Sequence, residues 1–393
     1  MEEWKEYKIS EIIEEIAMGP FGSNIKVDNF IDFGIPVLNG SNLQGFKLNE
    51  DSFNYVSEEK ADSLGKANAS RGDVVITHRG TLGQIVYIPL DSKYERYVIS
   101  QSQFRLRLNQ NIIRPDFFVY FFHTRIGQHR ILMNASQVGV PALARPTSTF
   151  KEITIPVPPM EIQNRVMAIL LSLDDKIELN HCINENLAQQ AQALFKSWFV
   201  DFEPFQDGKF VNSELGMIPE RWKAGNLEEL VEVKYGKDHK KLASGTIPVY
   251  GSGGIMRYVD QYLYNEESVL IPRKGSLNNV MYVNHPFWTV DTMFYTHMKI
   301  EGIAKFIYLL ISPKDLLSMN SGSAVPSMTV DILNKIAVII PPTTILQQFE
   351  SIVKPLFIMA ESLQKENYRL AHLRDTLLPK LMSGELKIND LSI

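Results

Sequence analysis

The sequence has a single cysteine, Cys182, among its 393 residues. One cysteine excludes an intramolecular disulfide and a zinc site built from cysteines. No apolar run approaches the roughly 18 residues that span a bilayer. The first residues, Met1 to Lys5, lack the basic and apolar regions of a signal peptide. We therefore expect the chain to work in a reducing cytoplasm.

Motifs that carry catalysis are also missing. There is no G-x-x-x-x-G-K-[ST] phosphate-binding loop, no H-E-x-x-H pair and no N-P-P-[YF] segment for amino-methyl transfer. The eight histidines show no metal-ligand spacing. Asp174 and Asp175 are neighbours on a helical pattern and point to different faces, as do His181 and Cys182. We predict a chain with no catalytic residue, no metal and no bound cofactor.

The charge balance is slightly acidic. The chain has 40 Lys and Arg against 45 Asp and Glu, a net charge of −5. A protein that neutralises many phosphates usually carries a basic face. Three explanations remain open: DNA is not the ligand, the basic surface is local, or a partner supplies it.

One long helical pattern occurs twice. After Pro158-Pro159 and again after Pro341-Pro342, apolar residues recur at alternating gaps of four and three, the spacing of a coiled-coil seam. The second series follows the first by 183 positions without an insertion. The pattern predicts one long helix over 159–200 and another, with a C-terminal tail, over 343–393. Each apolar seam needs a partner, and we expect the two helices to pack antiparallel. Pro355 predicts a kink or a late start in the second helix.

Two asparagines occupy equivalent positions in these seams, Asn184 and Asn367. A buried asparagine in a seam costs stability but fixes the register of the helices. In an antiparallel pair with two-fold pseudosymmetry, equivalent residues meet only at the axis. We predict that Asn184 and Asn367 lie close together there and set the register. The alternative is that both are exposed at the edge of the seam.

The residues that precede each helix also repeat. The matching pairs are Trp4-Lys5 and Trp222-Lys223, Ile35-Pro36-Val37 and Ile247-Pro248-Val249, and Val74-Val75-Ile76 and Val269-Leu270-Ile271. The β-branched runs predict short strands, and 116–126 and 304–310 predict helices. We predict an α+β fold in which two pseudo-repeated α+β domains, 1–158 and 222–342, are separated by two long antiparallel coiled-coil helices. Residues 201–221, rich in Asp, Pro and Gly, are expected to be a linker.

Polar loops follow matching strands in the two domains. Arg can bind guanine through two hydrogen bonds, Ser, Thr and backbone N–H groups bind phosphate oxygens, and Gly lets the backbone come close. One such loop is typical of a solvated turn, but its presence in both domains favours contact with DNA. The candidate DNA-binding residues are Thr77, His78, Arg79, Gly80, Thr81, Asn39, Ser41 and Asn42 in the first domain and Lys234, Tyr250, Ser252, Arg273, Lys274, Gly275 and Ser276 in the second.

A further repeated loop covers Gly139 to Pro141 and Ser321 to Pro326, and it either joins these contacts or packs as a turn. The helices repeat without a gap, whereas the domains differ in loop length and residue choice. A duplicated scaffold with two differing readers suits an asymmetric target in two parts.

Several longer segments carry a resemblance to a known family. They are P-P-x-x-x-Q at 158–163, L-F-K-S-W-F-V-D-F-E-P at 194–204, G-S-G-G-I at 251–255, R-K-G-S-L-N-N-V at 273–280 and L-L-P-K-L-M-S-G-E-L at 377–386. Through these segments essentially the whole chain resembles the specificity (S) subunit of type I restriction-modification enzymes.

The resemblance implies a non-catalytic subunit with two target-recognition domains, each reading one half of a bipartite sequence in double-stranded DNA. It implies that the helices set the spacer between the halves and dock two modification subunits, which bind S-adenosylmethionine and methylate adenine. It also implies restriction subunits that use ATP and Mg to translocate and cut. Modification subunits that clamp the duplex would explain the net charge of −5. The alternatives are a coiled-coil adaptor scaffold that reads no DNA and a fused methyltransferase or nuclease, which the missing methyl-transfer motif disfavours.

Overall fold

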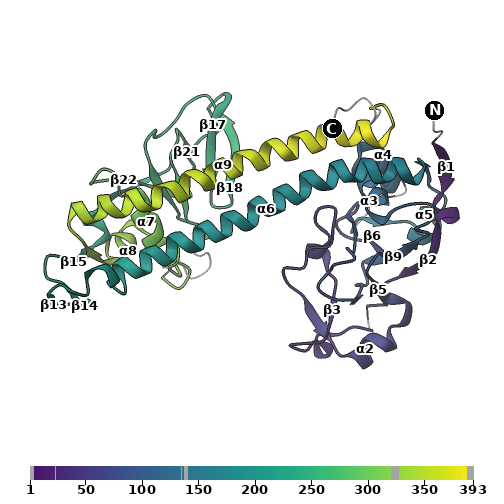
Figure 1. Cartoon of the computed structure of the whole chain (residues 1–393), viewed down its shortest axis with the longest axis horizontal. Helices are drawn as coiled ribbons and strands as arrows, with labels where there is room; N and C mark the ends of the chain where they lie inside the picture. Colours follow the sequence, from purple (N-terminus) through teal and green to yellow (C-terminus); the bar gives the residue numbers. More distant parts are fainter. Residues whose placement is uncertain (1–3, 23, 134, 137–139, 320–326, 387–393) are drawn as a thin grey trace. The chain divides into compact units, whose positions relative to one another are not determined.

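The computed structural model describes residues 4–22, 24–133, 135–136, 140–319 and 327–386. The chain divides into two compact units. Unit 1 comprises Met1–Glu178 and Glu366–Ile393, and unit 2 comprises Leu179–Lys365. Each unit therefore contains one globular part and one portion of each long helix, teal and yellow in Figure 1. Within the described ranges, no helix combines the length and the apolar character that crossing a membrane requires.

Unit 1 is built on two small sheets. The first, in the order β2-β9-β6-β7, is antiparallel, and the second has the order β4-β3-β8-β5, with β3 and β8 parallel. The antiparallel pair β1-β12 joins the two ends of the globular part. The strands are β1 Lys5–Lys8, β2 Ile13–Met18, β3 Ile35–Val37, β4 Asn54–Val56, β5 Asn68–Ser70, β6 Val74–Thr77, β7 Ile85–Tyr87, β8 Arg96–Val98, β9 Gln103–Leu108, β10 Ala135–Ser136, β11 Ala142–Leu143 and β12 Thr154–Val157.

The core of unit 1 forms around helix α3, which is apolar on nearly every side. Pro115 starts the helix at a position where no N–H bond is lost, and Phe117, Phe118 and Phe122 are fully buried. The helices are α1 Ile9–Ile12, α2 Glu58–Ser63, α3 Pro115–His123, α4 Arg125–Leu132 and α5 Pro146–Lys151, with 3₁₀ turns η1 Val27–Asn29, η2 Gly40–Leu43 and η3 Gly65–Ala67.

Unit 2 repeats this architecture. Its antiparallel sheet has the order β16-β22-β19-β20, its second sheet has the order β18-β17-β21 with β17 and β21 parallel, and β15 pairs with β23. The elements are η4 Glu203–Phe205, β13 Phe210–Ser213, β14 Gly216–Pro219, β15 Lys223–Asn226, η5 Leu227–Glu229, β16 Val231–Tyr235, β17 Ser244–Gly251, β18 Gly254–Val259, β19 Ser268–Pro272, β20 Met281–Val283, β21 Trp288–Thr289, β22 Met293–Met298, α7 Ala304–Ile311, α8 Val330–Asn334 and β23 Ala337–Ile340. The predicted α+β fold with two repeated domains is confirmed.

The long helices are α6, Met160–Phe199, and α9, Thr343–Met382, each of 40 residues. At about 1.5 Å per residue each is about 60 Å long. Of the two effects predicted for Pro355, the late start is wrong, because α9 begins at Thr343, and the kink stays a prediction. Proline has no N–H, so the carbonyl of Ser351 loses its helical partner. Ser351 and Pro355 are both exposed, so water can bind that carbonyl. Phe349 and Val353 keep the opposite side of the helix in the core.

The two helices run antiparallel within each unit. In unit 1, Arg374 Nη1 of α9 lies 2.6 Å from Asp174 Oδ1 of α6, and Asn367 Nδ2 lies 3.4 Å from Ile177 O. In unit 2 the last turns of α6 meet the first turns of α9, and the rings of Phe199 and Phe349 are 4.7 Å apart. The expected antiparallel coiled-coil arrangement is confirmed.

The predicted contact between Asn184 and Asn367 stays a prediction, because the two residues belong to different units. Asn367 is buried in unit 1, where its amide faces Ile177 O, and Asn184 is half-buried in unit 2. Asn180, one helical turn before Asn184 in the same seam, is completely buried.

Residues 201–221 differ from the expected linker. They contain the hairpin β13-β14, whose tight turn ends at Gly216 with φ of 97°. The side chains of Phe202 and Ile218 are buried in the core of unit 2, and Phe210 packs against it. The Asp, Pro and Gly content of the segment therefore marks turns within a folded element, and its aromatic residues supply the apolar contacts that a free linker lacks.

The junction between globular part and helices uses different chemistry in the two units. In unit 1, the Tyr120 hydroxyl donates to Asp174, and the Arg374 guanidinium that binds Asp174 lies 4.9 Å from the ring centre of Phe46. In unit 2, the buried Lys305 of α7 binds Glu350 of α9 and lies 3.0 Å from Glu267. Removing one partner of such a pair leaves a poorly compensated charge, so each junction favours one orientation of the globular part on its helices.

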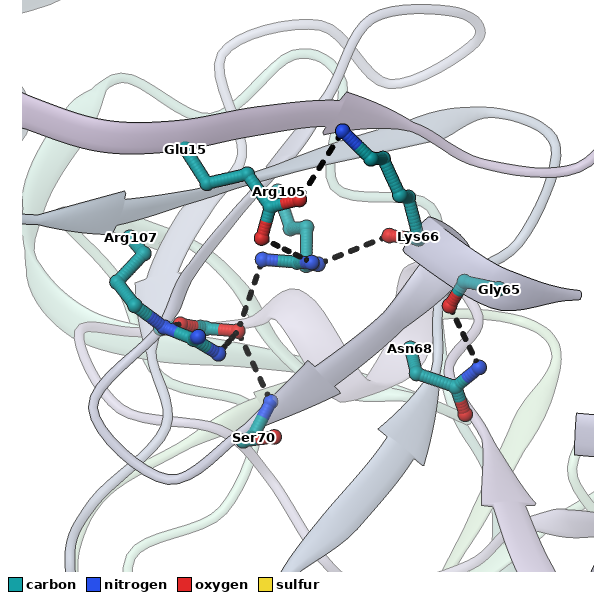
Figure 2. Close-up of polar contacts among 8 residues, drawn as sticks. Glu15, Gly65, Lys66, Asn68, Ser70, Arg105 and Arg107 are labelled. Atoms are coloured by element: carbon teal, nitrogen blue, oxygen red, sulfur yellow. Dashed lines mark hydrogen bonds and ion pairs between the residues drawn. The ribbon is translucent and has the colours of Figure 1, made fainter. Parts of the chain in front are cut away.

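A buried ionic cluster joins the two sheets of unit 1 (Figure 2). The Arg105 guanidinium of β9 donates to Glu15 Oε2 at 2.7 Å, to Asp73 Oδ2 at 3.3 Å and to Lys66 O at 3.0 Å. Asp73 also accepts from Arg107 at 2.9 Å and from the backbone N–H of Ser70, in β5, at 3.0 Å. The Arg105 side chain is 5% exposed and that of Asp73 0%, so each depends on the other for compensation.

We predict that Asp73→Ala lowers the free energy of unfolding by about 3–5 kcal/mol, because it leaves a buried guanidinium with a single carboxylate. Hydrogen exchange of β6 and β9 in the full chain measures this loss. Lys66→Ala is the control, since the Lys66 side chain is 79% exposed and its ammonium lies 3.6 Å from Glu15; little change is expected. Equal protection in the two variants would contradict the role of the cluster.

Candidate nucleic-acid interface

The loop after β6 in unit 1 has a defined conformation. His78 N donates to Ser102 O at 2.8 Å, Leu143 N donates to His78 O at 2.9 Å, and Gly80 N donates to Pro141 O at 2.9 Å. Gly80 has φ of 91°, in the left-handed region that favours glycine. The loop is therefore held between two other segments of the chain, and Arg79 and Thr81 remain exposed on it.

Further hydrogen bonds bring a second candidate loop to the same edge. Gln84 Nε2 donates to Gly40 O at 3.0 Å, and the Thr77 hydroxyl donates to Gln84 Oε1 at 3.0 Å. Gly19, directly after β2, donates its N–H to Gln103 O at 2.8 Å, so the end of β2 lies at the same edge. We call residues 19–22, 39–41, 78–81, 101–102 and 140–142 the loop face of unit 1.

Unit 2 has the same arrangement of hydrogen bonds. Arg273 N donates to Thr292 O at 2.8 Å, and Met328 N donates to Arg273 O at 2.9 Å, as His78 does with its two neighbours in unit 1. Gly275 has φ of 84° and matches Gly80. We call residues 236–241, 251–253, 273–276, 289–292 and 327–328 the loop face of unit 2. The structure thus makes Arg273 the counterpart of His78 and Lys274 the counterpart of Arg79.

The equivalent residues Arg273 and His78 differ in charge. The Arg273 guanidinium lies 5.4 Å from the ring centre of Tyr235, and its Nη1 lies 3.3 Å from Asp291 O. His78 Nε2 lies 3.1 Å from Gln101 O. Burial lowers the pKa of His78 below its ordinary value, and the Arg79 charge adds to this, although the hydrogen bond to Gln101 opposes it. His78 is therefore neutral near pH 7, whereas Arg273 is a charged and oriented donor.

The predicted site residues fall into three groups by burial. Ser41, Arg79, Gly80, Thr81, Lys274, Gly275 and Ser276 are exposed, and Asn39, His78, Lys234, Ser252 and Arg273 are half-buried. Thr77, Asn42 and Tyr250 are buried, and we assign them to the fold. Asn42 donates to Asn49 O and Ser52 O, both at 3.0 Å, and the Tyr250 hydroxyl lies 3.1 Å from His285 Nε2, with its pKa raised to about 12 by burial.

Two details separate strong candidates from weak ones. Lys234 forms an ion pair with Glu232 on the same strand, so its charge is already compensated. The carbonyl of Pro141 accepts from Gly80 N, so this part of the repeated loop Gly139 to Pro141 packs as a turn. Gly139 and Ser321 to Pro326 lie outside the described residues. Within the described ranges, no group of three or more His, Cys, Asp or Glu side chains is placed to hold a metal ion.

The sequence reasoning missed the basic segment Lys237 to Lys241 in the loop face of unit 2. The sequence does indicate this segment, because three lysines and a histidine lie within the five residues after Gly236, the counterpart of Gly19. Gln101 was missed as well, since only the fold places it beside His78.

The arrangement can be compared with known proteins. Residues 1–189 and 219–370 each match the type I restriction modification DNA specificity domain. The chain is 27% identical to the type I restriction enzyme MjaIX specificity subunit of Methanocaldococcus jannaschii, over 99% of this chain and 95% of that protein. It is 23% identical to the HindI specificity subunit of Haemophilus influenzae, over 98% and 100% of the two chains.

A solved structure shares the fold. The S subunit of the type I restriction-modification system of M. genitalium aligns with a TM-score of 0.59 and 19% identity, over 96% of each chain. The family match falls once on each repeat and covers most of the chain. As the resemblance predicted, the chain belongs to the type I restriction modification DNA specificity domain family.

Proposed function

We propose that each unit reads one half of a bipartite double-stranded DNA target through its loop face, within a type I restriction-modification complex. The observation that carries this proposal is that one strand-and-loop arrangement occurs twice with different side chains at equivalent positions. His78 stands where unit 2 has Arg273, and Arg79 stands where it has Lys274. Two domains with the same backbone arrangement but different side chains suit a target whose halves differ in sequence.

The chemistry of the loop faces fits base reading in a groove. Arg79 is exposed on a loop whose backbone is fixed, and Arg273 is oriented by Tyr235, so both can present a guanidinium to the O6 and N7 atoms of guanine. The Thr81 and Ser276 hydroxyls suit phosphate oxygens, whereas the Ser41 hydroxyl donates to Asn39 Oδ1 at 2.6 Å. Gly80 and Gly275 leave room for the sugar-phosphate backbone to approach.

The chain's role in the complex is non-catalytic in this proposal. Two modification subunits would bind S-adenosylmethionine and methylate adenine, and restriction subunits would use ATP and Mg, so no cofactor is bound by this chain. Docking on the helices is supported by exposed apolar side chains on α9: Ile352 and Met359, seven residues apart, share one face in unit 2, and Tyr368 is 76% exposed in unit 1. The compartment that suits a complex acting on DNA in this way is the cytoplasm.

The adaptor scaffold remains the competing function. It would need the helices and the repeated domains but not the oriented cations of the loop faces. Changing those cations therefore separates the two functions.

We predict that Arg79→Ala relaxes the sequence requirement of one half-site only, and that Arg273→Ala relaxes the other. Each change should cost about 1–3 kcal/mol at one base position if the contact is to a base. The measurement is mapping of N6-methyladenine in DNA modified by the complex of this chain with its modification subunits. Arg221→Ala, an exposed arginine of unit 2 outside its loop face, should leave the methylated sequence unchanged. A uniform loss of methylation over all sequences would instead assign phosphate contacts to Arg79 and Arg273.

We predict that the helices set the gap between the half-sites. Seven residues inserted after Glu178 in α6 and seven after Lys365 in α9 keep the seam and lengthen both helices by about 10.5 Å. At about 3.4 Å per base pair, the methylated motif should keep both half-sites and gain about three base pairs between them. An unchanged gap in a complex that still methylates would contradict the role of the helices.

A further inference from the structure

Unit 2 carries a basic segment that unit 1 lacks. Strands β2 and β16 end at equivalent places, since Met18 pairs with Phe104 and Tyr235 with Phe294. The glycine that follows each strand donates its N–H to the partner strand, to Gln103 O at 2.8 Å and to Met293 O at 3.0 Å. After these glycines the chains diverge: unit 1 continues with Pro20-Phe21-Gly22 and unit 2 with Lys237-Asp238-His239-Lys240-Lys241.

The basic segment has a fixed backbone. Lys237 N donates to Thr289 O at 2.8 Å, and the indole N–H of Trp288 donates to Lys237 O at 2.9 Å. Lys240 N donates to Asp238 Oδ1 at 3.2 Å, and Arg257 donates to Leu242 O at 2.7 Å. A side chain at Gly236 would place its Cβ 2.0 Å from Val290 O, so only glycine allows this path. The lysines therefore project from an ordered turn.

The four lysines of the loop face are exposed and free of carboxylates. Lys237, Lys240, Lys241 and Lys274 make no ion pair with any described residue, whereas Lys223, Lys234 and Lys305 of the same unit do. Lys237 and Lys274 are anchored to one segment, since their N–H groups bind Thr289 O at 2.8 Å and Thr292 O at 3.3 Å. The acidic residues of this face are Asp238, which caps the turn, and Asp291, whose backbone oxygen orients Arg273.

Unit 1 offers no such charge at the equivalent place. Phe21 is 86% exposed there, and the next lysine along the chain is Lys26. Lysine is a compact charge on a flexible stem, which suits phosphate contact more than base reading. A chain of net charge −5 with one ordered basic edge has the local basic surface that DNA binding needs.

Resting on the proposed function, we propose that Lys237, Lys240, Lys241 and Lys274 form a binding site for the phosphate backbone of DNA beside the second half-site. Unit 2 then supplies an electrostatic anchor for the duplex that unit 1 does not have.

The test is the salt dependence of DNA binding by the complex of this chain with its modification subunits. Each phosphate contact contributes about 0.9 to the slope of log K against log salt, so K237Q/K240Q/K241Q should lower the slope by about 2.7. Between about 50 and 200 mM salt, the fold-loss of affinity should shrink by roughly 40-fold relative to the unchanged complex. The methylated motif should stay the same. K209Q/K223Q/K335Q, three exposed lysines of unit 2 outside its loop face, should leave the slope unchanged.

The outcomes separate this proposal from the function on which it rests. An unchanged slope in K237Q/K240Q/K241Q, with the bipartite motif still methylated, overturns the phosphate site and leaves the proposed function standing. A changed motif with an unchanged slope also overturns it, because these lysines would then read bases. If the unaltered complex shows no preference for any sequence, the proposed function is overturned, and the phosphate site that rests on it is overturned as well.

Discussion

Both globular parts depend on the ends of the long helices to complete their cores. In unit 1, Val166 of α6 and Leu381 of α9 are buried in the same cluster as Phe117, and in unit 2 Phe199 and Phe349 play the same part. A long helix with a bare apolar seam is marginal in water, and so is a small sheet without cover. Each therefore stabilises the other. The loop face of each unit is thereby fixed to its own portion of the helices, which sequence reading at a set spacing requires.

Duplication explains how one architecture can serve two different readers. The sheets, the parallel pair β3-β8 or β17-β21 and the left-handed glycine of the loop recur in both units, because backbone hydrogen bonds hold them whatever side chains the loops carry. The side chains on this frame are free to diverge. Unit 1 presents the neutral His78 and the apolar Phe21, whereas unit 2 presents Arg273 and an ordered row of lysines. A slightly acidic chain can thus hold an anionic ligand, since the charge that matters is local.

The sequence predicted what periodicity and repetition encode: the α+β class, the strands at Val74 and Val269, and the antiparallel helices. It did not predict which polar side chains at the candidate sites are buried. Asn42 and Thr77 looked like ligand contacts because polar residues near a glycine are typical of both sites and turns, and only tertiary packing decides between them. It left open whether Pro355 would kink α9 or delay its start, since the exposure of the freed carbonyl depends on which helix face is buried. The lysines after Gly236 were visible in the sequence, but their common edge with Lys274 comes from the fold.

The central claim is that the chain holds two independent readers at a set distance. The most direct test is genome-wide mapping of N6-methyladenine in cells that express this chain with its modification subunits. The account predicts one motif made of two dissimilar half-sites separated by a fixed number of unspecified base pairs. A continuous motif, two identical halves in one orientation with a variable gap, or no methylation from a stable complex would contradict it.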